Sequence, residues 1–163
     1  MMQLSKKLYE MLNKQVNAEM YSAYAYQAMS AWLANENLDG MAHWMSEQAK
    51  EEMEHAFKIY GYLQERGEMP LLTAIEAPKT SWNSALEVFE DALAHEQKVS
   101  EMLIAILTAA REEKDYPTEN LMQWFVTEQV EEEDNGSKNL YLLGLAKDDT
   151  TLHLVDKEFA SRG

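Results

Sequence analysis

The sequence predicts an all-α fold: a four-helix bundle with one long crossover connection and a short fifth helix at the C-terminal end. Its 163 residues are 46% hydrophobic, enough for one sizeable core, so we expect a single domain over residues 1–163. Only six glycines and three prolines interrupt a composition rich in strong helix formers. Apolar residues also recur at intervals of three and four along four long stretches, the spacing of one helical face.

The first two helices are predicted over about residues 4–35 and 41–66. Apolar side chains such as Met45 and Ile59 keep the helical period in the second stretch. The segment between them, residues 37–40, reads Asn-Leu-Asp-Gly, which is typical of a tight turn. A short link makes neighbouring helices antiparallel.

A loop is predicted over residues 67–81, because this segment contains Pro70 and Pro78 and lacks a helical period. The second helix, at about 27 residues, is about 40 Å long. About 14 extended residues at roughly 3.3 Å each just run back along that length. The loop is therefore long enough to be a crossover, which makes the second and third helices parallel.

The third helix is predicted over about residues 82–114, with Thr80 or Ser81 as its N-cap. Its end is set by the Tyr-Pro pair at residues 116–117, since proline cannot continue a helix.

The last two helices are predicted over about residues 118–146 and 151–160. The sequence Asn-Gly-Ser around Gly136 is typical of a turn, which leaves a kink, an interruption or a harmless bend of the fourth helix as alternatives there. The fifth helix is amphipathic but too short to be a member of the bundle.

Each of the four long helices carries carboxylates on its apolar face at the same depth. On the second helix, Glu52 and His55 are three residues apart, so both point the same way and lie about 4.5 Å apart along the axis. The carboxylates on the other helices are Glu19, Glu96, Glu128 and Glu132. One such glutamate is usually solvated at the edge of its stripe, but no Lys or Arg lies on these apolar stripes at the matching depth to neutralise the carboxylates. A divalent or trivalent metal would supply the missing positive charge.

The candidate ligands are hard donors: carboxylates, one imidazole and the amide of Gln129. The chain has no cysteine, which excludes disulfides, thiolate zinc sites and iron–sulfur ligation. This donor set favours iron or manganese, and two ions bridged by Glu52 would use the ligands economically.

The net charge of -15 repels nucleic acid and anionic lipid and favours cations as partners. No apolar run approaches the roughly 20 residues of a membrane span, and the N-terminal residues resemble an amphipathic helix more than a signal segment. We therefore expect a cytoplasmic protein with no nucleic-acid or membrane partner.

The chain resembles the bacterial non-haem ferritins over nearly its full length. Five segments carry the resemblance in order, and together they are far more specific than any one alone. They are Asn17-Ala18-Glu19-Met20-Tyr21-Ser22, Glu51-Glu52-Met53-Glu54-His55, His95-Glu96-Gln97, Asp115-Tyr116-Pro117-Thr118 and Glu128-Gln129-Val130-Glu131-Glu132-Glu133.

The resemblance implies three iron positions and a catalytic centre. The first position would use Glu19, Glu52 and His55, and the second Glu52, Glu96 and Glu132, with Gln129 close to the ion or to dioxygen. A third position would use Glu51, Glu128, Glu131 and Glu132. Tyr26 matches the family's tyrosine beside the centre, either as an extra electron donor or as an aromatic filler that hydrogen-bonds a ligand carboxylate.

The implied function is that of a ferroxidase and an iron store. Members of the family assemble as shells of 24 subunits, oxidise Fe(II) with dioxygen or hydrogen peroxide within each bundle, and store ferric oxyhydroxide in the cavity. We therefore expect a homo-oligomer with iron as its cargo.

Two alternatives stay open. A haem-binding bacterioferritin is one alternative, because this chain is similar to that branch in the methionine that follows Glu52. On the fourth helix, however, bacterioferritins repeat a Glu-x-x-His motif, where this chain has Gln129-x-x-Glu132. A helical binding or scaffolding protein with structural acids is the non-catalytic alternative. A rubrerythrin-like peroxidase would need a cysteine-ligated module, which the sequence lacks.

Overall fold

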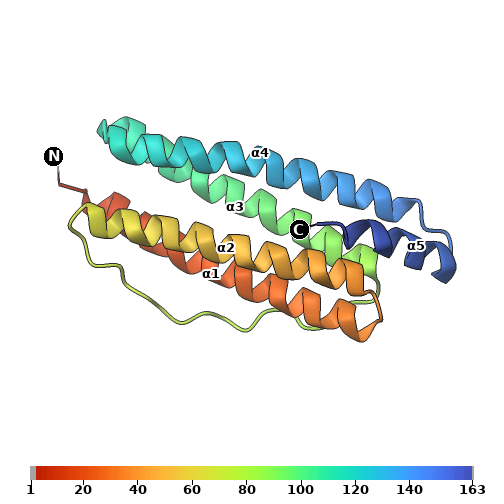
Figure 1. Ribbon diagram of the computed structural model, residues 1–163. Helices are drawn as coiled ribbons and strands as arrows, with labels where there is room; N and C mark the ends of the chain where they lie inside the picture. The colour runs from red at the N-terminus through yellow and green to blue at the C-terminus, as the bar shows by residue number, and fades with distance from the viewer. Residues whose placement is uncertain (1–2, 163) are drawn as a thin grey trace.

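The computed structural model describes residues 3–162, which form five helices and no strand. Their bounds are α1 (Lys6–Asn35), α2 (Asp39–Glu65), α3 (Ala85–Glu113), α4 (Tyr116–Gly144) and α5 (Asp149–Phe159). The four long helices lie side by side and α5 packs at one end (Figure 1). This confirms the predicted all-α bundle with its short fifth helix. Within residues 3–162, no helix has both the length and the apolarity needed to cross a membrane.

The third helix begins at Ala85, three residues later than predicted, and neither Thr80 nor Ser81 is its N-cap. Ser84 is the cap: its backbone is extended and its hydroxyl accepts a hydrogen bond from the amide of Glu87 at 3.1 Å. Trp82 is buried and its indole N–H donates to Asp91 at 2.8 Å, a tertiary contact that keeps this segment outside the helix. The crossover therefore spans residues 66–84.

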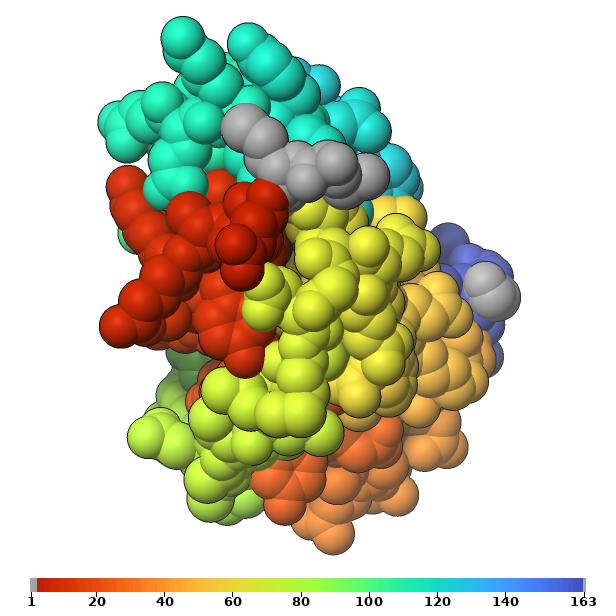
Figure 2. Space-filling view, turned by 90° about the vertical axis from the view of Figure 1, so that its left-hand side faces the viewer, coloured from red at the N-terminus to blue at the C-terminus, as the bar shows by residue number. Residues whose placement is uncertain are grey.

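The crossover runs back along α1, so that α2 and α3 are parallel, as predicted (Figure 1). Tyr9, Asn13 and Asn17, spaced four apart on one face of α1, each hydrogen-bond a backbone group of residues 69–74, at 2.8, 2.7 and 3.1 Å. Figure 2 shows the residues that follow α2, in yellow-green, lying against the red start of α1. The crossover is thus fastened by polar contacts to a neighbouring helix.

The fourth helix begins at Tyr116, two residues earlier than predicted, because Asp115 caps it by accepting from the amide of Thr118 at 3.1 Å. Pro117 fits within the first turn, where its missing N–H has no helical partner to lose. Of the alternatives at Gly136, the interruption is excluded, since α4 is one helix through to Gly144. Gly136 instead lets Leu93 of α3 approach closely: a Cβ there would lie 2.8 Å from Leu93 Cδ1.

The hydrophobic core is divided into two clusters, one toward each end of the bundle. Met45 and Phe89 belong to one cluster, and Leu12 and Phe125 to the other. Between them lies a layer of buried polar side chains, which is called the polar layer below. Its members are Gln15, Glu19, Ser22, Gln48, Glu52, His55, Glu96, Ser100, Gln129 and Glu132. The two apolar clusters hold the helices in register while the polar layer occupies the middle.

The fifth helix is attached to the start of α2 by a buried carboxylate. Asp156 accepts hydrogen bonds from the amides of Gly40 and Met41 at 3.0 and 2.8 Å. It therefore caps a helix whose own N-cap residue, Leu38, makes no side-chain cap. Gly40 permits the contact, because a Cβ there would lie 1.9 Å from the backbone oxygen of Asp156.

Replacing Asp156 by Ala should lower the free energy of unfolding by about 1–3 kcal/mol, because two buried N–H groups lose their acceptor. Urea denaturation followed by circular dichroism measures the change. Glu158→Ala, an exposed carboxylate on the same helix, is the matched control and should shift stability by less than about 0.5 kcal/mol. Equal effects of the two changes would show that the Asp156 contact contributes nothing.

Candidate metal centre

The helix α2 contributes two residues, Glu52 and His55, to the candidate metal centre. They lie one turn apart on α2, both are buried, and His55 Nδ1 is 3.4 Å from Glu52 Oε2. Glu19 comes from α1, Glu96 from α3 and Glu132 from α4, all at the same level of the bundle. The 3.6-residue period of each helix turns these side chains inward together with the apolar residues above and below them.

Two groups of buried ligand atoms result, and each group fits within 4.8 Å. Glu19, Glu52 and His55 make the first. The second contains Glu52, Glu96 and Glu132. The structure thus brings together both ligand sets that the sequence resemblance implied, with Glu52 common to the two.

Burial and mutual repulsion raise the pKa of most of these carboxyl groups. Burial, together with the charge of Glu52, raises the pKa of Glu96 to about 8 and that of Glu132 to about 7. The same two causes raise the pKa of Glu19 well above its ordinary range. The polar layer therefore binds protons near neutral pH when no metal is present.

Glu52 and His55 behave differently because they stabilise each other's charge. Burial pushes the pKa of Glu52 upward, but the hydrogen bond and charge of His55 and the hydrogen bond from Gln48 act against it, and the pKa falls below its ordinary value. Burial likewise opposes the charged form of His55, yet the hydrogen bond and charge of Glu52 raise the pKa of His55. Glu52 is thus an ionised carboxylate at the centre of the layer.

Two predicted site residues hold Glu96 in place. Gln129 donates its amide to Glu96 Oε2 at 3.1 Å and to the hydroxyl of Ser100 at 3.2 Å. Tyr26 donates its hydroxyl to the other oxygen of Glu96. Burial and the charge of Glu96 raise the pKa of Tyr26 well above its ordinary value, so the phenol stays protonated. The hydrogen-bonding role of Tyr26 is present, and its role as an electron donor stays a prediction.

Sequence reasoning missed Gln15 and Gln48 as members of the site. Gln15 donates to Glu19 at 2.8 Å, and Gln48 donates to Glu52 at 3.0 Å and to Glu132 at 2.8 Å. A signal was available: on both α1 and α2 a glutamine precedes the candidate ligand by four residues, which places it on the same face.

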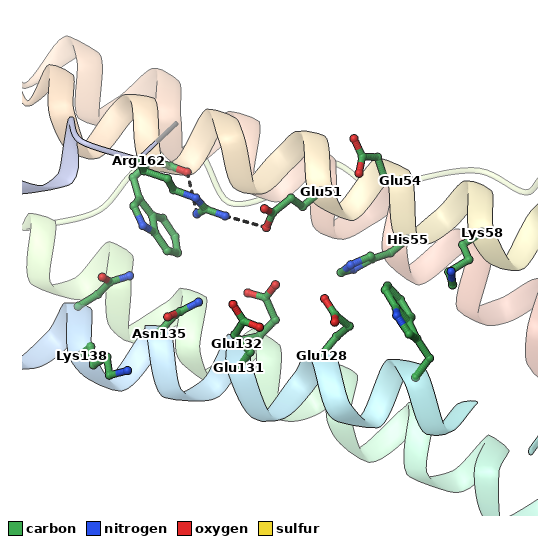
Figure 3. Close-up of a pocket in the computed structure, with 13 residues that line it drawn as sticks. Glu51, Glu54, His55, Lys58, Glu128, Glu131, Glu132, Asn135, Lys138 and Arg162 are labelled. Atoms are coloured by element: carbon green, nitrogen blue, oxygen red, sulfur yellow. Dashed lines mark hydrogen bonds and ion pairs between the residues drawn. The ribbon is translucent and has the colours of Figure 1, made fainter. Parts of the chain in front are cut away.

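A cavity of about 660 Å³ opens between α2 and α4 and reaches the centre at His55 and Glu132. In Figure 3, Glu51 and His55 of α2 face Glu128 and Glu132 of α4 across it. Carboxylates dominate the charged lining of this cavity, which suits a cationic occupant, and it is called the acidic cavity below.

The residues of the implied third position share this cavity without forming a compact ligand group. Glu51, Glu128 and Glu131 all line it, but in the described residues they belong to neither of the two ligand groups. Glu51 is instead paired with Arg162, whose guanidinium lies 2.7 Å from the Glu51 carboxylate (Figure 3). The same guanidinium lies 4.3 Å from the ring centre of Trp44. A residue near the C-terminus thus forms one wall of the cavity.

Comparison with known proteins agrees with this geometry. Residues 9–144 match the ferritin-like domain. The chain belongs to the ferritin family. It is 45% identical over 160 residues to the bacterial non-heme ferritin of Staphylococcus saprophyticus, covering 98% of this chain and 96% of that protein. The bacterial non-heme ferritin of Staphylococcus aureus is 41% identical over the same share of each chain.

Solved structures give the same family. An open-pore ferritin from the hyperthermophilic archaeon Archaeoglobus fulgidus superposes with a TM-score of 0.97 at 39% identity, covering 100% of both chains. A closed form engineered from the Archaeoglobus fulgidus ferritin superposes with a TM-score of 0.95, covering 98% of each chain. Membership of the ferritin family supports iron binding and a function in iron storage.

The raised pKa values predict how the metal-free fold responds to pH. Glu96 and Glu132 hold more protons folded than unfolded, so their contribution to stability is present below about pH 4.5 and is lost as pH rises through about 7 and 8. His55, with its raised pKa, acts in the same direction. Chelator-treated protein should therefore melt at a lower temperature at pH 9 than at pH 6.

Scanning calorimetry measures this dependence, and the doubly neutral variant Glu96→Gln/Glu132→Gln is its control. The control should lose much of the decrease, while the remaining decrease reports the general repulsion of an acidic chain. A wild-type melting temperature that is flat or rising between pH 6 and 9 would contradict the pKa assignments.

Proposed function

We propose that this chain is an iron-storage ferritin that oxidises Fe(II) with dioxygen or hydrogen peroxide at the centre around Glu52. The observation that carries the proposal is the polar layer itself: buried carboxylates from all four long helices meet there. In residues 3–162, no buried Lys or Arg accompanies them. Burying such charges without a partner is unfavourable, so the layer is built to receive cations.

Two ions of substrate iron would occupy the two ligand groups. The first would bind Glu19, Glu52 and His55, and the second Glu52, Glu96 and Glu132, with Glu52 between them. Iron supplies the electrons that reduce the oxidant. Carboxylates are hard donors and imidazole is a borderline donor, and both suit iron.

Proton transfer is the chain's own contribution on metal binding. Glu19, Glu96 and Glu132 have raised pKa values, so each must give up a proton before it can bind an ion. Before metal binds, Gln129 and Tyr26 position Glu96, because their hydrogen bonds go to its two oxygens. Iron binding should therefore weaken as pH falls through about 8 and 7.

The acidic cavity provides the route between the centre and solvent. Its carboxylates on α2 and α4 would pass iron to or from His55 and Glu132, and Glu51, Glu128, Glu131 and Glu132 would form the third position. The product would then accumulate as ferric oxyhydroxide within a shell.

The shell is proposed as an assembly of 24 copies. Large apolar side chains lie exposed on α1, α2 and the crossover, including Tyr24, Met53, Phe57 and Leu72. A largely apolar groove of about 430 Å³ runs among Met20, Met53 and their neighbours. A surface of this kind, on a chain that superposes on ferritin subunits, supports association with further copies.

Glu52→Ala tests the proposed chemistry, because it removes the carboxylate common to both ligand groups. Dioxygen uptake after addition of Fe(II) should lose its rapid phase, with a fall of about 100-fold or more, while gel filtration still shows the assembled shell. Glu65→Ala, an exposed carboxylate near the end of the same helix, should behave as wild type. Equal uptake rates in Glu52→Ala and wild type would reject the site and favour a structural role for the acids.

Arg162→Ala tests the third position. Removing the cation beside Glu51 should tighten binding of Tb³⁺ in the acidic cavity about two- to fivefold, the effect expected of a partly exposed ion pair. Luminescence sensitised by Trp44 and Trp124, which line the cavity, reports the binding. The control is Lys157→Ala, which removes an exposed charge from α5. Unchanged or weaker Tb³⁺ binding in Arg162→Ala would contradict a cation position at Glu51.

A further inference from the structure

The first two helices carry the same glutamine–glutamate pair in the polar layer. Gln15 precedes Glu19 by four residues on α1, and Gln48 precedes Glu52 by four residues on α2. Both glutamines are buried, with exposed fractions of 0% and 1%. In each pair the amide nitrogen donates to the carboxylate one turn further along, at 2.8 and 3.0 Å.

Within residues 3–162, the side-chain amides of Gln15 and Gln48 make hydrogen bonds through their nitrogen atoms but not through their oxygen atoms. The side-chain oxygens of Gln15 and Gln48 are both buried without a hydrogen-bond partner among the described residues. The N–H ends donate to carboxylate oxygens of Glu19, Glu52 and Glu132. A buried amide oxygen without a donor is unfavourable, so a glutamine placed only to fill the core would be a poor choice. The contacts to the carboxylates are what these two residues provide.

The hydrogen bond from Gln15 leaves one specific oxygen available on Glu19. Gln15 holds Glu19 Oε1, while Glu19 Oε2 is buried and without a partner among the described residues. Fixing one oxygen of a carboxylate sets the rotation of the group and so directs the other oxygen. In this case the other oxygen is available to an ion of the first ligand group.

Gln48 differs from Gln15 because its amide reaches two carboxylates. Besides Glu52 on its own helix, it donates to Glu132 Oε2 of α4 at 2.8 Å. Glu52 belongs to both ligand groups and Glu132 to the second. One amide therefore sets the relative placement of ligands on α2 and α4, the two helices on either side of the acidic cavity.

We infer that Gln15 and Gln48 are positioning residues for metal ligands, with Gln15 serving the first ion position and Gln48 serving both. The inference rests on the proposed function, since it assigns the glutamines to ligands of that centre. It distinguishes the two residues by their contacts: loss of Gln15 disturbs Glu19 alone, whereas loss of Gln48 disturbs Glu52 and Glu132.

Zinc titration of the metal-free protein by isothermal calorimetry tests the inference, because Zn²⁺ occupies the ligands without being oxidised. Wild type should bind two ions tightly. Gln15→Leu should keep one position at the wild-type dissociation constant and weaken the other by about 10–100-fold, the usual effect of losing a partner of a ligand. Gln48→Leu should weaken both positions. Gln64→Leu, the same change at an exposed site on α2, should bind as wild type.

A general loss of stability would not produce this difference between Gln15 and Gln48, and melting temperatures of the metal-free variants are measured alongside. If Gln48→Leu does not fold, zinc binding is measured in Gln48→Met instead, because methionine has a similar length and no N–H. Two positions of wild-type affinity in the Gln48 variant, or equal losses in the Gln15 and Gln48 variants, would overturn the inference. If wild type itself fails to bind two zinc ions, the proposed centre fails and the inference with it.

Discussion

The interaction on which the structure depends is the meeting of like-charged carboxylates in one buried layer. Glu52 lies at its centre, and its charge raises the pKa values of Glu19, Glu96 and Glu132 around it. Such a layer costs free energy in the metal-free fold, because the groups must either hold protons or repel one another. Cations bound in the polar layer would offset the repulsion among its carboxylates.

The rest of the bundle compensates for this cost from its two ends. Apolar clusters on either side of the polar layer bury the large side chains that hold the helices together. Polar contacts between helices reinforce both ends: Arg66 pairs with Asp115 at 2.8 Å where α2 ends and α4 begins, and Asp156 caps the start of α2. The packed ends hold the helices together, so that the middle can be polar and open to the cavity.

The sequence predicted what depends on local periodicity and missed what depends on contacts between distant segments. The helical period was enough to place Glu52 and His55 on one face of a helix. It was not enough to place the start of α3, which follows from the contact of Trp82 with Asp91, or the pairing of Glu51 with Arg162. The role of Gly136 could not be derived from the sequence either, because its neighbour Leu93 lies on another helix.

The two iron ions proposed to bind at Glu52 are tested most directly by anomalous scattering at the iron edge, from crystals loaded with Fe(II) under nitrogen. We predict two peaks roughly 3.5–4 Å apart, the usual separation in two-metal sites. They should lie on either side of Glu52, one beside Glu19 and His55, the other beside Glu96 and Glu132. Iron found at exposed carboxylates alone, with no density in the polar layer, would contradict the proposal.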